Sequence, residues 1–111
     1  MIRNLIKNSK MSNIILKMTT LMAAVRSDNL KKFNELVESA SSKHIDRSLN
    51  IAVINDHDSF VPILLANDKL TQKGFESAFD SAIFNRKKEL MKLFLENPRM
   101  TSDLIIDKLL L

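Results

Sequence analysis

The chain has 111 residues, enough for one domain with a hydrophobic core, and its lack of cysteine excludes disulfides and thiolate chemistry. Hydrophobic residues make up 45% and charged residues 27%, and the single glycine and two prolines favour helices over a sheet with many tight turns. The net charge of +4 resides in residues 1–17, so the balanced remainder argues against a domain-wide nucleic-acid surface.

The N-terminal segment "MIRNLIKN" places Ile2, Leu5 and Ile6 at helical spacing. We expect residues 1–20 to include the second helix of a partial repeat. A basic amphipathic segment is the alternative, because residues 1–17 contain four basic side chains and no acid. Such a segment could bind a membrane surface or act as a targeting element.

Three segments that follow align without gaps: "LMAAVRSDNLKKFNELVE" (Leu21–Glu38), "LNIAVINDHDSFVPILLA" (Leu49–Ala66) and "FDSAIFNRKKELMKLFLE" (Phe79–Glu96). Each starts with an apolar residue, reaches an alanine three positions later, breaks into polar residues and ends in an apolar cluster. The alanines are Ala24, Ala52 and Ala82. A small residue at one fixed place lets neighbouring helices approach closely. We therefore predict helix–turn–helix repeats over residues 21–48, 49–78 and 79–101.

The polar breaks predict where the second helix of each repeat begins. In the middle repeat we expect helices over roughly 46–54 and 59–66, with Pro62 within or just past the first turn of the second, where its missing N–H costs little. Aspartate and asparagine side chains accept hydrogen bonds from free N–H groups at helix starts. The expected N-caps in the three breaks are Asp28, Asp56 or Asp58, and Asn85.

The C-terminal stretch predicts a partial repeat over residues 102–111. Pro98 is expected to stop the preceding helix, and Thr101 or Ser102 to cap the next one. "SDLIIDKLLL" ends on three leucines and has no polar outer face, which a terminal repeat usually needs. Three explanations stay open: the third repeat covers this end, the chain is a fragment, or the end pairs with a partner.

The repeat pattern resembles the ankyrin family. In "LMAAVRSDNLKKFNELVE", Asp28 and Asn29 stand where the family has its Gly-His turn, and His57 matches the family histidine in the second unit. In the third unit, "ELMKLFLE" resembles the family's second helix. The resemblance covers residues 21–97 and implies an all-α, helical-hairpin repeat solenoid.

The chain also departs from the ankyrin pattern. The family's opening "T-P-L-H" is absent, the turn glycine is missing from all three units, and the repeats of 28 and 30 residues are shorter than the usual 33. The shortfall lies between units, in "SASSKHIDR" and "NDKLTQKGFE". We therefore expect shortened inter-repeat loops in place of projecting hairpins. Generic helical-hairpin repeats are the main alternative.

The residues offer little support for catalysis or cofactor binding. His44 and His57 are the only histidines, and the nearest carboxylates, Asp46, Asp56 and Asp58, lie at expected helix ends, where capping explains them. A metal site needs three or four convergent ligands, so no metal is expected. One glycine in the chain argues against a phosphate loop. We expect no enzyme activity, no cofactor and no small-molecule ligand.

The resemblance implies a site for a partner protein instead. Ankyrin-type arrays bind partners on the concave face, through inter-unit loops and residues just before each turn. The corresponding positions here are Arg26, Ser27, Ile54, Asn55, Phe84 and Asn85. Ile54 and Phe84 are apolar, and exposed apolar neighbours mark an interaction surface. The alternative is that the shortened loops bury both side chains.

The sequence thus predicts a protein–protein interaction module within one repeat domain, residues 1–111, with no nucleic-acid partner. The alternative is the substrate-recognition fragment of a larger bacterial effector or host-modifying enzyme, which the apolar C-terminal end would fit. The favoured location is intracellular, in the cytosol, or in the host cytosol if the protein is an effector. A membrane-surface role through residues 1–17 is a third possibility.

Overall fold

The computed structural model describes residues 21–110, which are helical with short connections. A helical segment over residues 21–26 is followed by α3 (Leu30–Leu36), η1 (Val37–Ser39), α4 (Ser42–Ile54), η2 (Asp58–Phe60), α5 (Val61–Leu65), α6 (Gln72–Phe84), α7 (Lys88–Leu95), α8 (Ser102–Ile105) and η3 (Ile106–Leu110). No strand occurs between residues 21 and 110. The expected all-α class is confirmed for this part of the chain.

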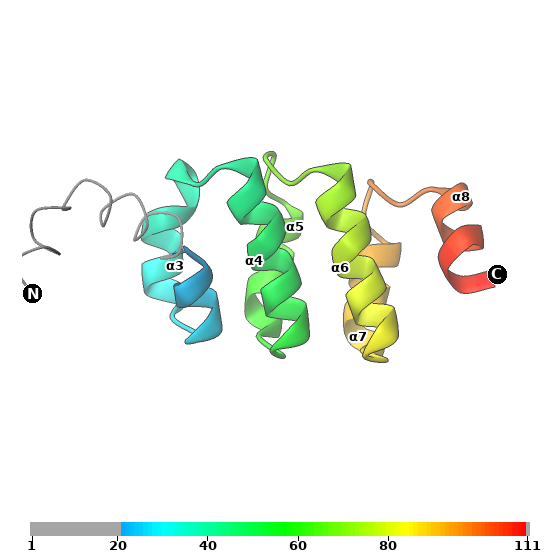
Figure 1. Cartoon of the computed structure of the whole chain (residues 1–111), viewed down its shortest axis with the longest axis horizontal. Coiled ribbons are helices and arrows are strands. Elements are labelled where there is room, and N and C mark those ends of the chain that lie inside the picture. The colour runs from blue at the N-terminus through cyan, green and yellow to red at the C-terminus, as the bar shows by residue number, and fades with distance from the viewer. Residues whose placement is uncertain (1–20, 111) are drawn as a thin grey trace, which may run out of the picture.

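The helices form antiparallel pairs that stand in a row (Figure 1). Helix α4 pairs with α5, α6 pairs with α7, and α4 lies directly beside α6. In Figure 1, α4 and α6 form the front layer, with α5 and α7 behind them. The described part of the chain measures 56 × 24 × 22 Å along its principal axes, so it is elongated along this row.

The three repeated alanines are buried at equivalent places. Ala24, Ala52 and Ala82 each lie near the end of the first helix of a pair, and each is buried in the continuous core. The fully buried rings of Phe33, Phe60, Phe75, Phe79 and Phe94 fill the space between the two layers. The burial expected from the sequence pattern is therefore confirmed for all three alanines.

The first helices begin earlier than the sequence pattern indicated. Helix α4 starts at Ser42, not near Asp46, because Ser41 is its N-cap and accepts a hydrogen bond from the backbone N–H of His44. Thr71 caps α6 in the same way, and Thr101 caps α8 as expected. The expected repeat starts at Leu49 and Phe79 therefore fall inside helices.

The turns within the pairs also differ from expectation. Asp28, Asp56 and Arg86 adopt left-handed backbone conformations, with φ of 58°, 62° and 54°. In each turn the next residue's N–H bonds back to the carbonyl of the buried alanine, at 2.8, 3.0 and 2.9 Å. This is the Schellman geometry that ends a helix. The predicted N-cap roles of Asp28 and Asp56 are wrong, because these residues terminate the first helix.

Capping of the second helices follows different rules in each pair. Asn29 is the N-cap of α3, and its side chain accepts from the N–H of Lys32 at 3.1 Å. The second pair starts instead with the turn η2, and Pro62 lies in the first turn of α5, as expected. Asn85 is the C-cap of α6, and its Nδ2 donates to the carbonyl of Ser81, so its predicted role as an N-cap is wrong as well.

Long cationic side chains hold neighbouring pairs together at the loop end of the row. Lys69 Nζ donates to the carbonyls of Glu38 and Ala40, both at 2.7 Å. Arg99, 30 residues later, donates to three loop carbonyls of the preceding pair, those of Leu65, Asn67 and Leu70. These bonds satisfy backbone acceptors that short loops leave free. They replace the hydrogen bonds that a hairpin between pairs would supply.

The C-terminal end is a single helical segment, as expected for residues 102–110. Leu104 is buried against the core, while Ile106, Leu109 and Leu110 are exposed. The described third pair therefore does not cover this end fully. The predictions for residues 1–20, a partial repeat or a basic amphipathic segment, fall outside the described residues. Between residues 21 and 110, no helix has the length and apolarity needed to cross a bilayer.

Candidate functional site

Two apolar side chains are exposed where the first helices end. Phe84, the last residue of α6, is 86% exposed, and Ile54, the last residue of α4, is 49% exposed. The alternative, that the shortened loops bury both side chains, is wrong, because those loops lie at the opposite end of α4 and α6 (Figure 1). An exposed phenylalanine leaves a large apolar area in water.

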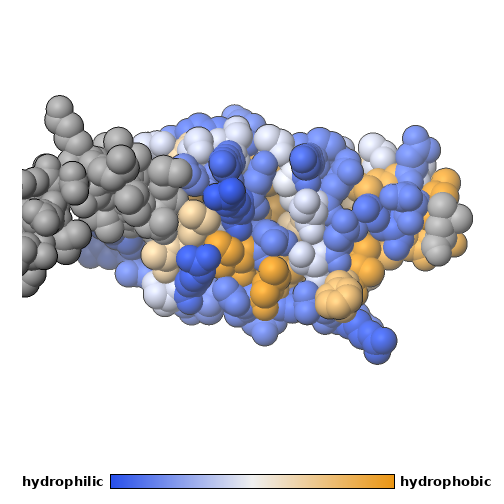
Figure 2. All heavy atoms as spheres, viewed as in Figure 1, coloured by the Kyte–Doolittle hydropathy of each residue, from blue (hydrophilic) through white to orange (hydrophobic). Residues whose placement is uncertain are grey.

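The helix packing brings these two side chains to one shallow hollow. Ile54 and Phe84 line a depression of 540 Å³ together with Asp80, Ser81 and Asn85. Its exposed wall is mainly apolar, although three of its five residues are polar. In Figure 2, orange residues lie at the lower ends of α4 and α6, surrounded by blue. Three of the six residues expected from the sequence, Ile54, Phe84 and Asn85, thus share one surface.

The other expected residues lie apart from this hollow. Arg26 ends the first helical segment and Ser27 follows it, one pair earlier in the row, and both are exposed. The Ser27 hydroxyl donates to the carbonyl of Ala23 at 2.8 Å, so it is engaged within its own helix. Asn55 follows Ile54 and is exposed, but it does not line the depression.

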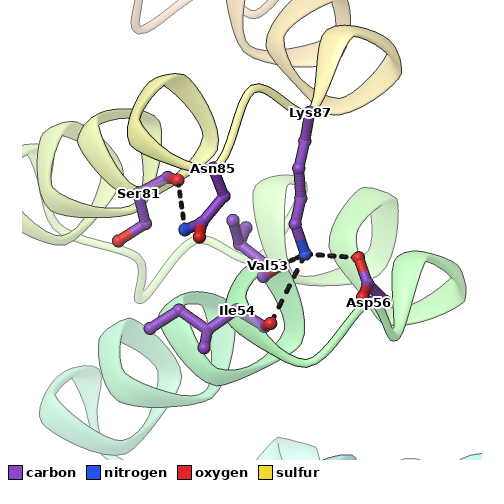
Figure 3. Close-up of polar contacts among 6 residues, drawn as sticks. All are labelled: Val53, Ile54, Asp56, Ser81, Asn85 and Lys87. Atoms are coloured by element: carbon purple, nitrogen blue, oxygen red, sulfur yellow. Dashed lines mark hydrogen bonds and ion pairs between the residues drawn. The ribbon is translucent and has the colours of Figure 1, made fainter.

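Lys87 contacts the end of α4 that carries Ile54, and the sequence analysis did not select it as a site residue. Its Nζ donates to the backbone carbonyls of Val53 and Ile54 and forms an ion pair with Asp56 (Figure 3). The side chain of Lys87 is largely buried, while that of Asp56 is exposed. Lys87 thus connects the third pair to the last turn of α4, and it holds Ile54 beside Phe84.

His57 occupies the equivalent place one pair earlier. Its Nε2 lies 3.0 Å from the carbonyl oxygen of Arg26, so Nε2 carries the proton and donates. Its Nδ1 lies 3.9 Å from a carboxylate oxygen of Asp28. The spacing of 30 residues between His57 and Lys87 was the signal that could have identified Lys87.

One further ion pair borders the site. Lys108 of η3 lies 3.0 Å from a carboxylate oxygen of Asp80 on α6. This hydrogen bond raises the pKa of Lys108 above its usual 10.5, and the nearby charges of Asp80, Asp107 and Glu76 act in the same direction against desolvation. The pair fixes the C-terminal segment beside the hollow.

The described residues bring no chemically reactive group to this surface. His44 lies at the other end of α4 from Ile54, and its Nδ1 is hydrogen-bonded to the Ser41 hydroxyl at 2.9 Å. His57 is hydrogen-bonded to the carbonyl of Arg26 in the preceding pair. Within residues 21–110, no three side chains of His, Cys, Asp or Glu gather around a point that could hold a metal ion. The arrangement is suited to contact with another molecule.

Comparison with known proteins adds no family to these observations. No protein-family model matches the chain, and neither a curated protein nor a solved structure shows a significant match.

Proposed function

We propose that the chain is a degenerate ankyrin-like array that binds a partner protein through the exposed face of α4 and α6, the counterpart of the concave face of ankyrin-type arrays, without catalytic activity of its own. The equivalent burial of Ala24, Ala52 and Ala82, and the equivalent turns that follow them, support the repeat interpretation. In each turn a backbone N–H also donates a hydrogen bond to the carbonyl of the buried alanine, which supports the same interpretation.

The exposure of Phe84 carries the functional proposal. A phenylalanine that is 86% exposed contributes almost nothing to the core, yet it sits beside Ile54 in an apolar hollow. Aromatic residues at the centre of such surfaces often supply most of the binding free energy. The polar residues Asp80, Ser81 and Asn85 line the same hollow beside the two apolar side chains.

The proposal is tested by pull-down from a plausible host lysate, followed by affinity measurement with the captured protein. Phe84→Ala is expected to weaken that affinity by more than about 1 kcal/mol while changing the free energy of unfolding by less than about 0.5 kcal/mol. Leu95→Ala, which truncates an exposed leucine on α7, is the matched control and should leave affinity unchanged. Equal affinities of the Phe84→Ala variant and the unaltered chain would refute the proposal.

A further inference from the structure

The same two helices carry a charged groove at their opposite ends. Between the first halves of α4 and α6 lies a depression of 430 Å³, lined by Lys43, Asp46, Arg47, Asn50, Lys73, Gly74 and Ser77. It holds three cationic side chains and one carboxylate. In Figure 2, strongly blue residues lie over the upper parts of α4 and α6.

The three cations have no partner within the part of the chain that the structure describes. Lys43, Arg47 and Lys73 make neither a hydrogen bond nor an ion pair with any other residue between 21 and 110. The carboxylate of Asp46 is already engaged, since it accepts from the backbone N–H of Thr71 at 2.9 Å and from its hydroxyl at 2.6 Å. With three cations and one carboxylate, the residues that line the groove carry a net positive charge.

The charged groove and the apolar hollow belong to one continuous surface. On α4, Lys43 and Ile54 are separated by 11 positions, which is three helical turns and places them on one face. Lys73 and Phe84 have the same separation on α6. At a rise of about 1.5 Å per residue, the cationic end lies roughly 16 Å from the apolar end.

Between the two ends, the helices are linked by a polar contact. The Ser81 hydroxyl donates to Asn50 Oδ1 at 2.6 Å, which joins α6 to α4. The amide nitrogen of Asn50, which lines the groove, makes no hydrogen bond to any residue between 21 and 110, so it can donate one to a ligand. An elongated ligand lying along this surface would meet cations, then an amide donor, then an apolar hollow.

We infer that this surface binds a segment of a partner protein that carries a cluster of aspartate or glutamate residues and, about 16 Å away, a large apolar side chain. Charge complementarity selects the acidic end, because carboxylates pair with Lys43, Arg47 and Lys73. The exposed pair Ile54 and Phe84 selects the apolar end. This inference rests on the proposed function and specifies the chemistry of its partner.

The test selects random displayed peptides of about 12 residues on the full chain, a length that spans the surface as either a helix or a strand. Synthetic versions of the enriched peptides are then measured by fluorescence anisotropy. We expect enriched peptides to combine several acids with one large apolar residue. Their affinity should fall about tenfold or more in the double variant Lys43→Glu/Lys73→Glu, because two attractive contacts become repulsive.

The matched control is Lys31→Glu/Lys88→Glu, which makes the same change in net charge at exposed lysines on α3 and α7 and should leave affinity within about twofold. Raising the salt concentration should weaken binding to the unaltered chain much more than to the charge-reversed groove variant. Circular dichroism and thermal unfolding establish that each variant is folded.

The outcomes separate this inference from the proposed function. Peptides whose binding needs Phe84 but tolerates charge reversal at Lys43 and Lys73 would overturn the inference and leave the proposed function standing. Selection of no peptide would overturn both the inference and the proposed function. Peptide binding that depends neither on Phe84 nor on the charges of Lys43 and Lys73 would also overturn both. A single-stranded oligonucleotide or phosphatidylserine vesicles could instead displace the peptides from the unaltered chain and fail to bind the charge-reversed variant. That result would assign the groove to those ligands and overturn the inference of a protein partner.

Discussion

His57 and Lys87, 30 residues apart, occupy the same place in successive helix pairs and make equivalent bonds to the pair before. His57 reaches the carbonyl of Arg26, and Lys87 reaches the carbonyl of Ile54, two residues that themselves occupy equivalent positions. Each cationic or ionisable side chain also faces the aspartate of the preceding turn. The pairs are thus joined at both ends, by His57 and Lys87 near the turns and by Lys69 and Arg99 near the loops.

Replacing Lys87 tests how much its bonds to the preceding pair contribute to the free energy of unfolding. Lys87→Met removes the donors to the carbonyls of Val53 and Ile54 while keeping most of the apolar stem. We expect a loss of about 1–2 kcal/mol in the free energy of unfolding, mainly from the carbonyl bonds, because the partner carboxylate of Asp56 is exposed and adds little. The measurement is urea unfolding at constant m-value.

Lys88→Met is the control for that experiment, since Lys88 is exposed on the first turn of α7 and has no bonding partner among residues 21–110. It should change stability by less than about 0.5 kcal/mol. Equal stabilities of the Lys87→Met and Lys88→Met variants would show that the inter-pair bonds contribute nothing.

Arg86 offers a site for stabilisation. Its φ of 54° lies in the left-handed region, which costs a residue with a Cβ roughly 1 kcal/mol relative to glycine. Arg86→Gly should therefore stabilise the protein by about 0.5–1 kcal/mol and raise Tm by several degrees in a thermal melt.

Two further glycine variants test whether the gain at Arg86 comes from its left-handed backbone. Asp28→Gly should give a smaller gain, because aspartate tolerates the left-handed conformation better than arginine does. Lys88→Gly, placed in the regular helix α7, should lower Tm. A decrease of Tm in the Arg86→Gly variant would contradict the assigned backbone strain.

Gly74 should resist replacement although it lies in a helix. Alanine at an exposed helical position is normally more stable than glycine by about 1 kcal/mol. Here a Cβ on Gly74 would lie 2.2 Å from Cγ and 2.3 Å from Oδ1 of Asp46, whose carboxylate is held by Thr71. We expect Gly74→Ala to destabilise the protein by about 1–3 kcal/mol in chemical unfolding.

A double-mutant cycle checks the cause of that loss. In the Asp46→Ala background the carboxylate is gone, so the additional cost of Gly74→Ala should shrink by more than about 0.5 kcal/mol. If the two changes are simply additive, the contact between α4 and α6 at this point does not explain the glycine.

The pKa of Lys108 tests the ion pair that holds the C-terminal segment. NMR titration of its side chain should give a pKa above 10.5, and the Asp80→Asn variant should lower it towards that usual value. A raised pKa means that the charged lysine is favoured in the folded chain, so its contribution is complete below pH 10.5 and is lost as pH rises through the raised value. An unchanged pKa in the Asp80→Asn variant would show that the pair does not form in solution.

Local patterns in the sequence predicted much of the helical framework. The near-absence of glycine and proline indicated helices, and the spacing of Ala24, Ala52 and Ala82 indicated buried contact points. Thr101 was one of the two residues expected to cap the last helix. These features depend on steric size and on bonds between residues a few positions apart. Such information is present in any short stretch of the chain.

The tertiary structure decided the features that depend on residues about 30 positions apart. Asp56 was one of two residues, with Asp58, predicted to cap the second helix of its pair. Instead its left-handed backbone ends the first helix, and its carboxylate pairs with Lys87 of the next pair. The exposure of Ile54 and Phe84 stayed undecided until the loops were seen to lie at the other end of α4 and α6. Hydrophobic periodicity determines which helix face is buried, but only packing between pairs determines which side chains remain in water.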